Sequence, residues 1–187
     1  MCGIVGYIGN RDITSVLLVG LERLSYRGYD SAGIATISDG ELSCWKKPGK
    51  IHELSEALKN LIIKGNVGIG HTRWATHGEP NEVNAHPQLS QRKKVAVVHN
   101  GIVENYLELK AKLKREGHIF LSQTDTEVIV HLIERYLQNS LEEAVEKAVK
   151  DLTGSFAIAV ISEADPEKIV VYRKGSPLVL GVGVGEN

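Results

Sequence analysis

Cys2 is the first residue whose chemistry stands out, because it directly follows Met1. Removal of Met1 would place a thiol and a free α-amine on the same residue. An α-amine has an ordinary pKa of about 7.7–8.0, far below the 10.4 or so of a lysine, so near neutral pH it can accept the thiol proton. The pair is thus a complete nucleophile and base. The alternative is an inert, buried cysteine that opens a strand, and this is our interpretation of Cys44, which lies mid-strand beside Trp45.

A second group of chemically active side chains lies in residues 71–80, where a predicted strand runs into a loop. Arg73, Trp74, Thr76 and His77 supply a guanidinium, an indole, a hydroxyl and an imidazole within five positions. Arginine fits a carboxylate in a bidentate fork, and Thr76 and the loop amides can add further donors. The run is therefore typical of a site for a small anion-bearing substrate. A solvated polar loop explains any one of these residues, but it is a weak explanation of all of them.

Asn100 and Gly101 follow a predicted buried strand and place a side-chain amide next to an unhindered backbone N–H. Two such donors can stabilise an oxyanion. An Asn-Gly turn is the structural alternative, and for the dipeptide alone it is the stronger one. Asp125 stands at a predicted helix start, which is a sufficient explanation of its presence. Arg27 is either a surface charge or a loop organiser, and its spacing does not decide between them.

Other signals are weak. The spacings of His71, His77 and His86 match no zinc pattern, so the sequence does not favour a metal site. The glycine-rich residues 181–185 lack the helix that follows in a dinucleotide-binding fingerprint. Ser31 lies between glycines that are one residue too far apart for a nucleophile elbow.

The elements that must position these groups follow from hydrophobic periodicity and from turn residues. Strands are predicted at 3–8, 32–38, 42–47, 67–72, 95–99, 156–162, 168–173 and 178–184. Asp39-Gly40 predicts a tight hairpin, because both central positions must tolerate positive φ, and Asp165-Pro166 is expected to turn a second.

Helices are predicted at 16–24, at 51–61 and at 106–116, the last with Gly117 as its C-cap. Thr124 with Glu127, and Ser140 with Glu143, resemble capping boxes that open two further helices. Hairpins mixed with paired helices favour helices packed outside antiparallel sheets over a regular β-α-β winding. The predicted fold class is α+β.

The composition indicates one globular unit without an internal domain boundary. The chain has 187 residues, 42% of them hydrophobic, which is enough for one sizeable core. A formal net charge of −1 without a basic block makes nucleic acid and anionic membranes poor candidates as partners. The N-terminus lacks the features of a signal peptide, and no stretch is long and apolar enough to span a bilayer. Two cysteines cannot form a disulfide framework, so we expect a cytoplasmic protein.

Taken together, these motifs resemble the glutaminase domain of the glucosamine-6-phosphate synthase family, over essentially every residue from Cys2 to Asn187. The motifs that carry the resemblance are residues 1–6, 26–33, 71–80, 84–87, 98–101 and 124–127. The resemblance implies a four-layer αββα sandwich of the N-terminal-nucleophile, or class II glutamine amidotransferase, type. It also implies that residues 1–187 form a glutaminase domain that stops short of the family's C-terminal end, without the isomerase domain that follows in the family.

The resemblance also implies roles for particular residues. Mature Cys2 would be the nucleophile and its α-amine the base, with the Asn100 side chain and the Gly101 N–H holding the oxyanion. Arg73 would bind the α-carboxylate of glutamine, and Asp125 its α-ammonium.

The remaining implied roles are supporting ones. Thr76 and His77 would lie near the substrate carboxylate, Trp74 would shape a mobile substrate loop, and Arg27 would organise the surroundings of the nucleophile. The implied reaction hydrolyses L-glutamine to glutamate and ammonia through a γ-glutamyl thioester, with no metal or organic cofactor. In the family the ammonia passes to a sugar-phosphate isomerase domain that makes glucosamine 6-phosphate from fructose 6-phosphate. The full-length enzyme is expected to be a homodimer.

Two other classes remain open at this stage. A non-catalytic amino-acid-binding module would keep Arg73 and Asp125 but would have no use for a processed Cys2. A metal-dependent hydrolase built on the histidines would lose its activity to chelators, and an amidotransferase would not.

Overall fold

The computed structural model describes residues 2–74 and 78–187 of the chain, which form two antiparallel sheets with helices on their outer faces. The first sheet has the strand order β1-β4-β2-β3. Its strands are β1 (Gly3–Ile8), β4 (Val67–Arg73), β2 (Ser31–Ser38) and β3 (Glu41–Pro48). The predicted hairpin between β2 and β3 is confirmed: Asp39 and Gly40 have φ values of 51° and 80°.

The second sheet has the strand order β5-β6-β7-β8. Its strands are β5 (Gln88–Leu89), β6 (Val95–Val103), β7 (Gly154–Ser162) and β8 (Asp165–Lys174). The second hairpin is also present, but its turn consists of Glu163 and Ala164, and Asp165-Pro166 already belongs to β8. A proline is tolerated there because β8 is an edge strand.

The prediction of a strand at residues 178–184 is wrong. The described chain has no strand at these positions, and their hydrophobic side chains face outward, with Val179 92% and Val182 80% exposed. An apolar run forms a strand only where a partner strand takes up its hydrogen bonds. In this region only Glu186 forms an isolated bridge, with Gly9.

Five α-helices and one short 3₁₀ helix complete the described structure. They are α1 (Ile13–Arg23), the 3₁₀ helix η1 (Ser25–Arg27), α2 (Ile51–Leu58), α3 (Tyr106–Arg115), α4 (Thr126–Tyr136) and α5 (Leu141–Asp151). Helix α1 begins three residues before its predicted start, because the Asp12 carboxylate accepts the N–H groups of Thr14 and Ser15. Ser140 caps α5 as predicted.

The capping box predicted at Thr124 is wrong. Asp125 is the residue that precedes α4, and its side chain makes no cap hydrogen bond. The Glu127 carboxylate turns away from the helix start and accepts hydrogen bonds from the backbone of Leu121 and Ser122. A capping motif of four residues cannot predict that N–H groups in the preceding loop compete for the Glu127 carboxylate.

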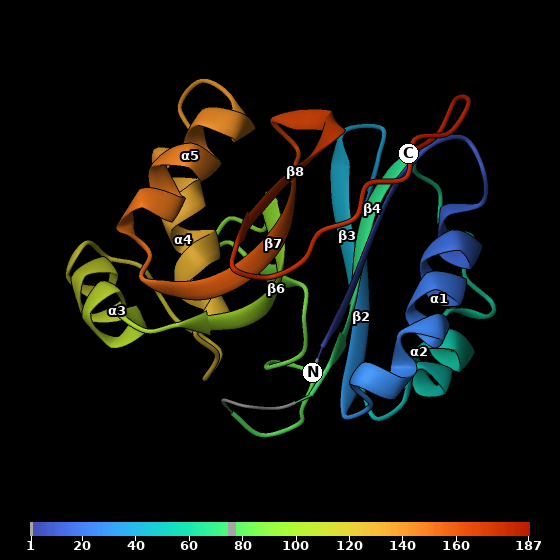
Figure 1. Cartoon of the computed structure of the whole chain (residues 1–187), viewed down its shortest axis with the longest axis horizontal. Coiled ribbons are helices and arrows are strands. Elements are labelled where there is room, and N and C mark those ends of the chain that lie inside the picture. The colour runs from blue at the N-terminus through green and yellow to red at the C-terminus, as the bar shows by residue number, and fades with distance from the viewer. Residues whose placement is uncertain (1, 75–77) are drawn as a thin grey trace.

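Figure 1 shows four layers, with α1 and α2 outside the first sheet and α3, α4 and α5 outside the second. The two sheets face each other across a core that includes Ile37 and Ile69 from one sheet and Val98 and Ile161 from the other. A separate core lies between each sheet and its helices. This arrangement confirms the α+β class and the αββα sandwich.

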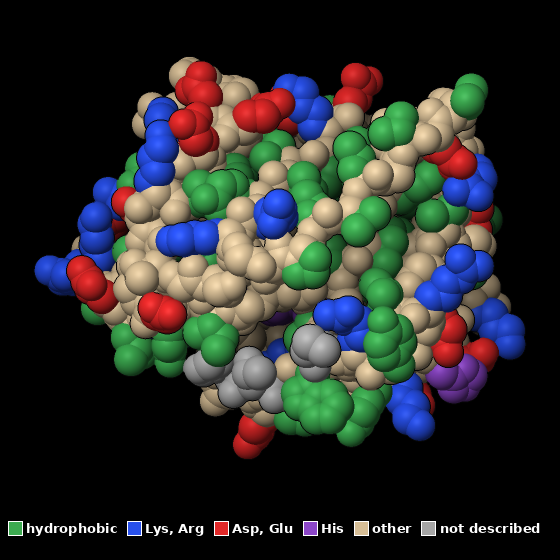
Figure 2. Space-filling model, viewed as in Figure 1, with side chains coloured by type: hydrophobic (Ala, Val, Ile, Leu, Met, Phe, Trp, Pro, Cys, Tyr) green, Lys and Arg blue, Asp and Glu red, His purple; other side chains and the backbone are tan. Residues whose placement is uncertain are grey.

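The visible surface has interspersed charges, with acidic and basic side chains next to one another (Figure 2). None of the helices in the described part of the chain has both the length and the apolar character that crossing a membrane requires.

The packing between the two sheets generates a stability prediction. Ile161 is fully buried between the sheets, whereas Ile62 is 91% exposed. We expect Ile161→Ala to lower the free energy of unfolding by about 2–5 kcal/mol, because it leaves a cavity, and Ile62→Ala to change it by less than about 0.5 kcal/mol. Denaturant unfolding followed by circular dichroism measures both. Equal losses in the two variants would contradict the assignment of this core.

Candidate active site

Cys2 lies immediately before β1, and the pairing of β1 with β4 decides where its thiol is. Gly3 pairs with Thr72, so Cys2 lies beside the end of β4. The backbone N–H of Trp74 donates to Cys2 Sγ at 3.2 Å, and Sγ lies 3.6 Å from the Trp74 carbonyl oxygen. Burial raises the pKa of the Cys2 thiol, while the Trp74 hydrogen bond and the charge of Arg73 oppose that rise. A thiol in this environment needs a base to ionise near neutral pH.

Asn100 reaches the same point from the other sheet. Its Nδ2 donates to the carbonyl oxygen of Cys2 at 3.2 Å, although 98 positions separate the two residues. The turn proposed as the alternative for Asn100 and Gly101 is wrong, because both residues lie within β6 and pair with Ala157 and Phe156 of β7.

Gly101 has a backbone that other residues rarely adopt. Its φ is +122°, and a Cβ atom at this position would overlap the carbonyl oxygen of Ser155. Glycine is therefore required by both the conformation and the close approach of β7. The residue is exposed. It thus offers an unshielded backbone next to the Asn100 amide.

The orientation of the Asn100 amide is set by His71, whose spacing in the sequence matches no zinc pattern and predicts no other role. His71 is fully buried on β4, and its Nε2 lies 3.0 Å from both Asn100 Oδ1 and the carbonyl oxygen of His99. Both oxygens are acceptors, so Nε2 must carry the proton. Burial lowers the pKa of His71 to about 3, which keeps the imidazole neutral near pH 7. With its oxygen held by His71, the amide must direct its nitrogen toward Cys2.

Strand alternation was the signal that could have identified His71. Residues two apart on a strand share a face, so His71 lies on the same face of β4 as Arg73. His86 extends this buried group, with its Nδ1 3.3 Å from His71 Nε2 and its ring stacked on that of His99. Burial lowers the pKa of His86 and of His99 as well. The three imidazoles are therefore neutral packing and hydrogen-bonding groups.

Arg73 ends β4 and is only 4% exposed. Its Nη2 donates to the carbonyl oxygen of Gly78 at 3.2 Å, and its Nη1 to that of Glu79 at 3.4 Å. Burial lowers the pKa of the guanidinium, and the nearby charges of Asp30, Cys2 and Asp125 oppose this. The loop carbonyls thus hold a buried cation close to the thiol.

Asp125 lies at the start of α4 and is 5% exposed. One carboxylate oxygen accepts the N–H of Val103 at 2.9 Å, at the end of β6. The other lies 3.9 Å from Nδ1 of His99, which itself lies 2.8 Å from Oγ1 of Thr126. Asp125 therefore joins the end of β6 to the start of α4, and its buried negative charge is electrostatically coupled to Arg73.

Trp74 and the loop before β2 border the site on its solvent side. The indole is 46% exposed and packs edge-on against the Tyr29 ring at a centroid distance of 5.0 Å. The Asp30 N–H donates to the Arg73 carbonyl oxygen at 3.1 Å. Arg27 ends η1, at the start of this loop. Tyr29 and Asp30 belong to the 26–33 motif, but the sequence does not predict their contacts with Trp74 and Arg73.

The structure therefore brings Cys2, Arg73, Trp74, Asn100 and Asp125 together, with Gly101 beside Asn100. Thr76 and His77 lie outside the described residues. Cys44 has a different environment: it is mid-strand in β3, and burial raises its pKa to about 12. It is accordingly an inert thiol.

Comparison with known proteins identifies the family. The sequence profile of the glutamine amidotransferase domain family matches residues 54–179. The chain is 56% identical over 187 residues to the glutamine--fructose-6-phosphate aminotransferase (isomerizing) of Aquifex aeolicus, and 55% identical over 188 residues to that of Thermococcus kodakarensis. All of this chain is covered in both comparisons, and it spans 32% and 31% of the two proteins, about a third of their length.

Solved structures show the same fold. The glutamine phosphoribosylpyrophosphate amidotransferase of B. subtilis, in complex with ADP and GMP, is 32% identical and has a TM-score of 0.74, over 87% of this chain and 35% of that one. A glutamine aminotransferase class-II domain protein from Silicibacter pomeroyi has a TM-score of 0.59 over 96% of this chain and 79% of that one; at 12% identity it shows the fold alone. From the profile match, the curated relatives and the shared fold, we conclude that the chain belongs to the glutamine amidotransferase domain family.

Proposed function

We propose that the chain, once Met1 is removed, hydrolyses L-glutamine to L-glutamate and ammonia through a γ-glutamyl thioester on Cys2. One observation carries the proposal: the Asn100 amide from one sheet and the Trp74 N–H from the other both contact Cys2, at 3.2 Å. A thiol, a side-chain amide and a buried guanidinium thus lie in one place, which supports these roles. Membership of the family supports glutamine as the substrate.

The first half of the reaction forms the thioester. The α-amine of mature Cys2 takes the thiol proton, and the thiolate attacks the side-chain amide carbon of glutamine. The charge that develops on the amide oxygen is held by Asn100 Nδ2 and the Gly101 N–H. The α-ammonium then gives its proton to the leaving nitrogen, and the C–N bond breaks to release ammonia.

The second half releases glutamate. Water gives a proton to the α-amine and attacks the thioester carbon, and the same two donors hold the second oxyanion. The C–S bond then breaks, and the proton returns to sulfur. The sum is glutamine plus water to glutamate plus ammonia. This chemistry uses no cofactor.

Substrate selection is assigned to the two buried charges. Arg73 binds the α-carboxylate in a fork, and Asp125 accepts from the α-ammonium. Thr76 and His77 add donors near the carboxylate. Trp74, which packs edge-on against Tyr29, shapes the solvent side of the substrate site, and Arg27 organises the loop behind it.

The role of the chain in a longer enzyme is a further part of the proposal. It spans about a third of relatives named glutamine--fructose-6-phosphate aminotransferase (isomerizing). We assign it the glutaminase half of such an enzyme. The ammonia would pass to a C-terminal sugar-phosphate isomerase domain, which converts fructose 6-phosphate to glucosamine 6-phosphate in a cytoplasmic homodimer.

Cys2→Ala tests the nucleophile. We expect glutamate release to fall to background while glutamine still binds, because the thiol makes the covalent bond and the two charged groups provide the affinity. An enzyme-coupled glutamate assay and calorimetric titration with glutamine measure the two quantities. Cys44→Ala is the matched control and keeps activity. Release of ammonia by Cys2→Ala at the parent rate would show that Cys2 is not the nucleophile.

Protein that retains Met1, confirmed by intact mass, should be nearly inactive because its Cys2 nitrogen is an amide.

Asn100→Ala tests the oxyanion donor. We expect kcat to fall by about 10²–10³ with a smaller change in KM, since the charge on oxygen develops only in the transition state. Steady-state kinetics and a thermal melt of each variant are needed, so that unfolding is not mistaken for lost catalysis. Unchanged kinetics would rule out the role.

His71→Ala tests whether His71 orients the Asn100 amide. We expect a smaller loss of kcat than in Asn100→Ala and almost no further loss in the double variant, since the two residues form one unit. Additive losses would contradict the orientation of Asn100 by His71.

Arg73→Ala tests substrate selection. Asparagine carries both α-charges but is one methylene shorter, and a misplacement of about 1 Å can cost on the order of 10²-fold in rate. The parent chain should therefore strongly prefer glutamine. Arg73→Ala should chiefly raise KM and narrow the preference for glutamine over a des-amino analogue or a simple primary amide. Unchanged ratios of kcat/KM among these substrates would show that Arg73 is only a loop charge.

A further inference from the structure

A second cluster of reactive side chains lies on the outer side of the second sheet, at a cavity between α4 and the segments that precede β6 and follow α3. His118, His131 and Glu134 each offer one ligand atom, and these atoms lie within 4.8 Å of one another. His131 and Glu134 are three residues apart on α4 and therefore share a face. His118 approaches from the segment after α3. Neither the proposed reaction nor the family comparison uses any of these groups.

His131 is a buried imidazole, 1% exposed, whose Nδ1 makes no hydrogen bond within the described chain. Its Nε2 lies 3.7 Å from Glu127 Oε1, beyond hydrogen-bond distance, and the buried Nδ1 of His118 makes no hydrogen bond in the described chain either. The ring of His131 packs edge-on against those of His118 and Phe120, at centroid distances of 5.1 and 4.6 Å. Such contacts hold the ring, but they do not replace the hydrogen bonds that its buried polar atoms lose on leaving water.

We propose that His118, His131 and Glu134 bind a first-row divalent transition-metal ion, Zn²⁺ being the best match to two imidazoles and a carboxylate. Ligand atoms of a tetrahedral zinc site lie about 3.3–3.6 Å apart, given metal–ligand bonds of about 2.0–2.2 Å. To bind the ion, the three ligand atoms would have to approach one another by about 1 Å. His118 and Glu134 can supply it, because both side chains are only partly buried.

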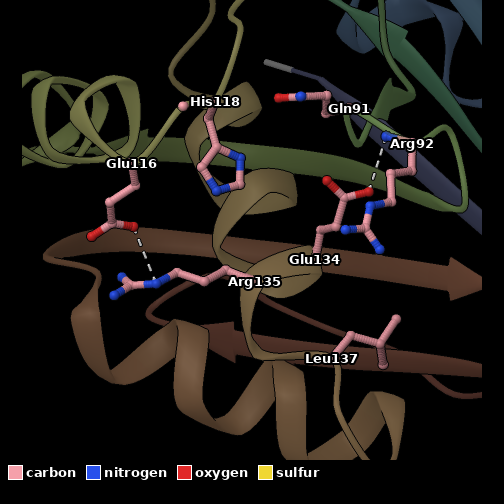
Figure 3. Close-up of a pocket in the computed structure, with 8 residues that line it drawn as sticks. Gln91, Arg92, Glu116, His118, Glu134, Arg135 and Leu137 are labelled. Carbon is pink, nitrogen blue, oxygen red and sulfur yellow. Dashed lines mark hydrogen bonds and ion pairs between the residues drawn. The ribbon is translucent and has the colours of Figure 1, made fainter.

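The cavity gives the ion access and room for a water ligand. Its volume is about 400 Å³, and both His118 and Glu134 line it. Figure 3 shows the His118 ring and the Glu134 carboxylate facing this space, with one Glu134 oxygen accepting the Arg92 backbone N–H, at 3.0 Å. The charge of Arg135 is paired with Glu116 at 3.2 Å. The acidic and basic side chains around the cavity therefore balance.

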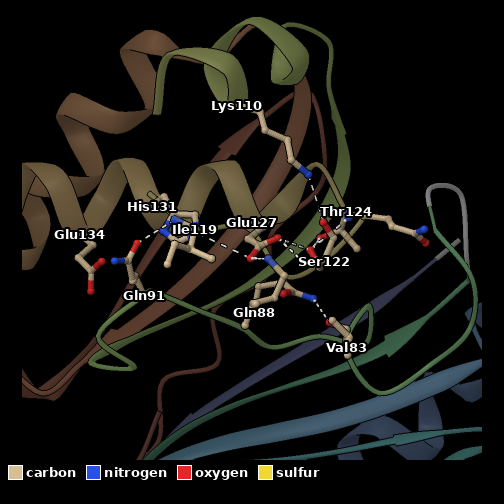
Figure 4. Close-up of polar contacts among 12 residues, drawn as sticks. Val83, Gln88, Gln91, Lys110, Ile119, Ser122, Thr124, Glu127, His131 and Glu134 are labelled. Carbon is tan, nitrogen blue, oxygen red and sulfur yellow. Dashed lines mark hydrogen bonds and ion pairs between the residues drawn. The ribbon is translucent and has the colours of Figure 1, made fainter. Parts of the chain in front are cut away.

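His131 has a carboxylate beside one ring nitrogen, as metal-binding histidines commonly do. Figure 4 shows His131 between Glu134 and Glu127 along α4, and its Nε2 lies 3.7 Å from Glu127 Oε1. Histidine ligands commonly direct their second ring nitrogen at a carboxylate, which fixes the orientation of the ring. Glu127 is itself held by the backbone N–H groups of Leu121 and Ser122.

Calorimetric titration of ZnCl₂ into the metal-stripped chain tests the proposal. The Cys2→Ala background removes the competing catalytic thiol. We expect one Zn²⁺ per chain, and a melting temperature about 5–10 °C higher at a hundredfold excess over Kd. His118→Ala and Glu134→Gln should each weaken binding at least tenfold, whereas His52→Ala, which changes an exposed histidine of α2, should leave it unchanged.

Two controls separate a metal site from a structural role. Titration with Co²⁺ should give the visible absorption of a tetrahedral complex, and His118→Ala should abolish it. Melting of each variant in EDTA shows that it is folded. The proposal is overturned if no Zn²⁺ binds, or if neither His118→Ala nor Glu134→Gln weakens its binding. Glutamine hydrolysis, measured separately, is not affected by that outcome.

Discussion

The antiparallel pairing of β1 with β4 is the constraint on which the site depends. It places Gly3 opposite Thr72 and thereby holds Cys2 against Trp74 at the end of a buried strand. Because β4 also pairs with β2 on its other edge, its position is fixed from both sides. A register slip of one residue would turn every side chain of β1 to the opposite face. The packing of the apolar strands therefore determines where the thiol lies.

The packing of the two sheets supplies the other half of the site. Their apolar faces bring β6 over β4, so that the Asn100 amide reaches the Cys2 carbonyl oxygen. His71 stands at this junction, and its burial as a neutral imidazole is what makes Asn100 directional. In the proposed reaction, an amide that could flip would present its oxygen to a developing negative charge, so the His71 donor would serve the reaction as well as the packing.

Two charged residues of the site, Asp125 and Arg73, also make hydrogen bonds that hold the fold together. Asp125 accepts the N–H of Val103 and so connects the end of β6 to the start of α4. Arg73 is held by the carbonyl oxygens of Gly78 and Glu79. A buried charge is costly unless it is paired or hydrogen-bonded. In the proposed reaction, the same two side chains also bind the opposite charges on the α-carbon of the substrate. The same helix α4 carries His131 and Glu134 further along, on the outer side of the sheet.

Local features of the chain can be predicted from the order of its residues. Neighbouring residues are enough to predict the hairpin at Asp39-Gly40, the Ser140 cap and the apolar faces of the helices. Cys2 can be identified as well, because its position after Met1 is fixed by the covalent chain. Other features depend on residues far away in the chain and are seen only in the folded structure. It placed Asn100 inside a strand where a turn was plausible, directed Glu127 away from the predicted cap, and left residues 178–184 without the strand that their pattern predicted. It also gave His71 a role that its spacing did not suggest. Each of these features depends on a hydrogen bond or a buried contact with residues far away in the chain. A local sequence pattern contains only one of the two partners, so it cannot predict the contact.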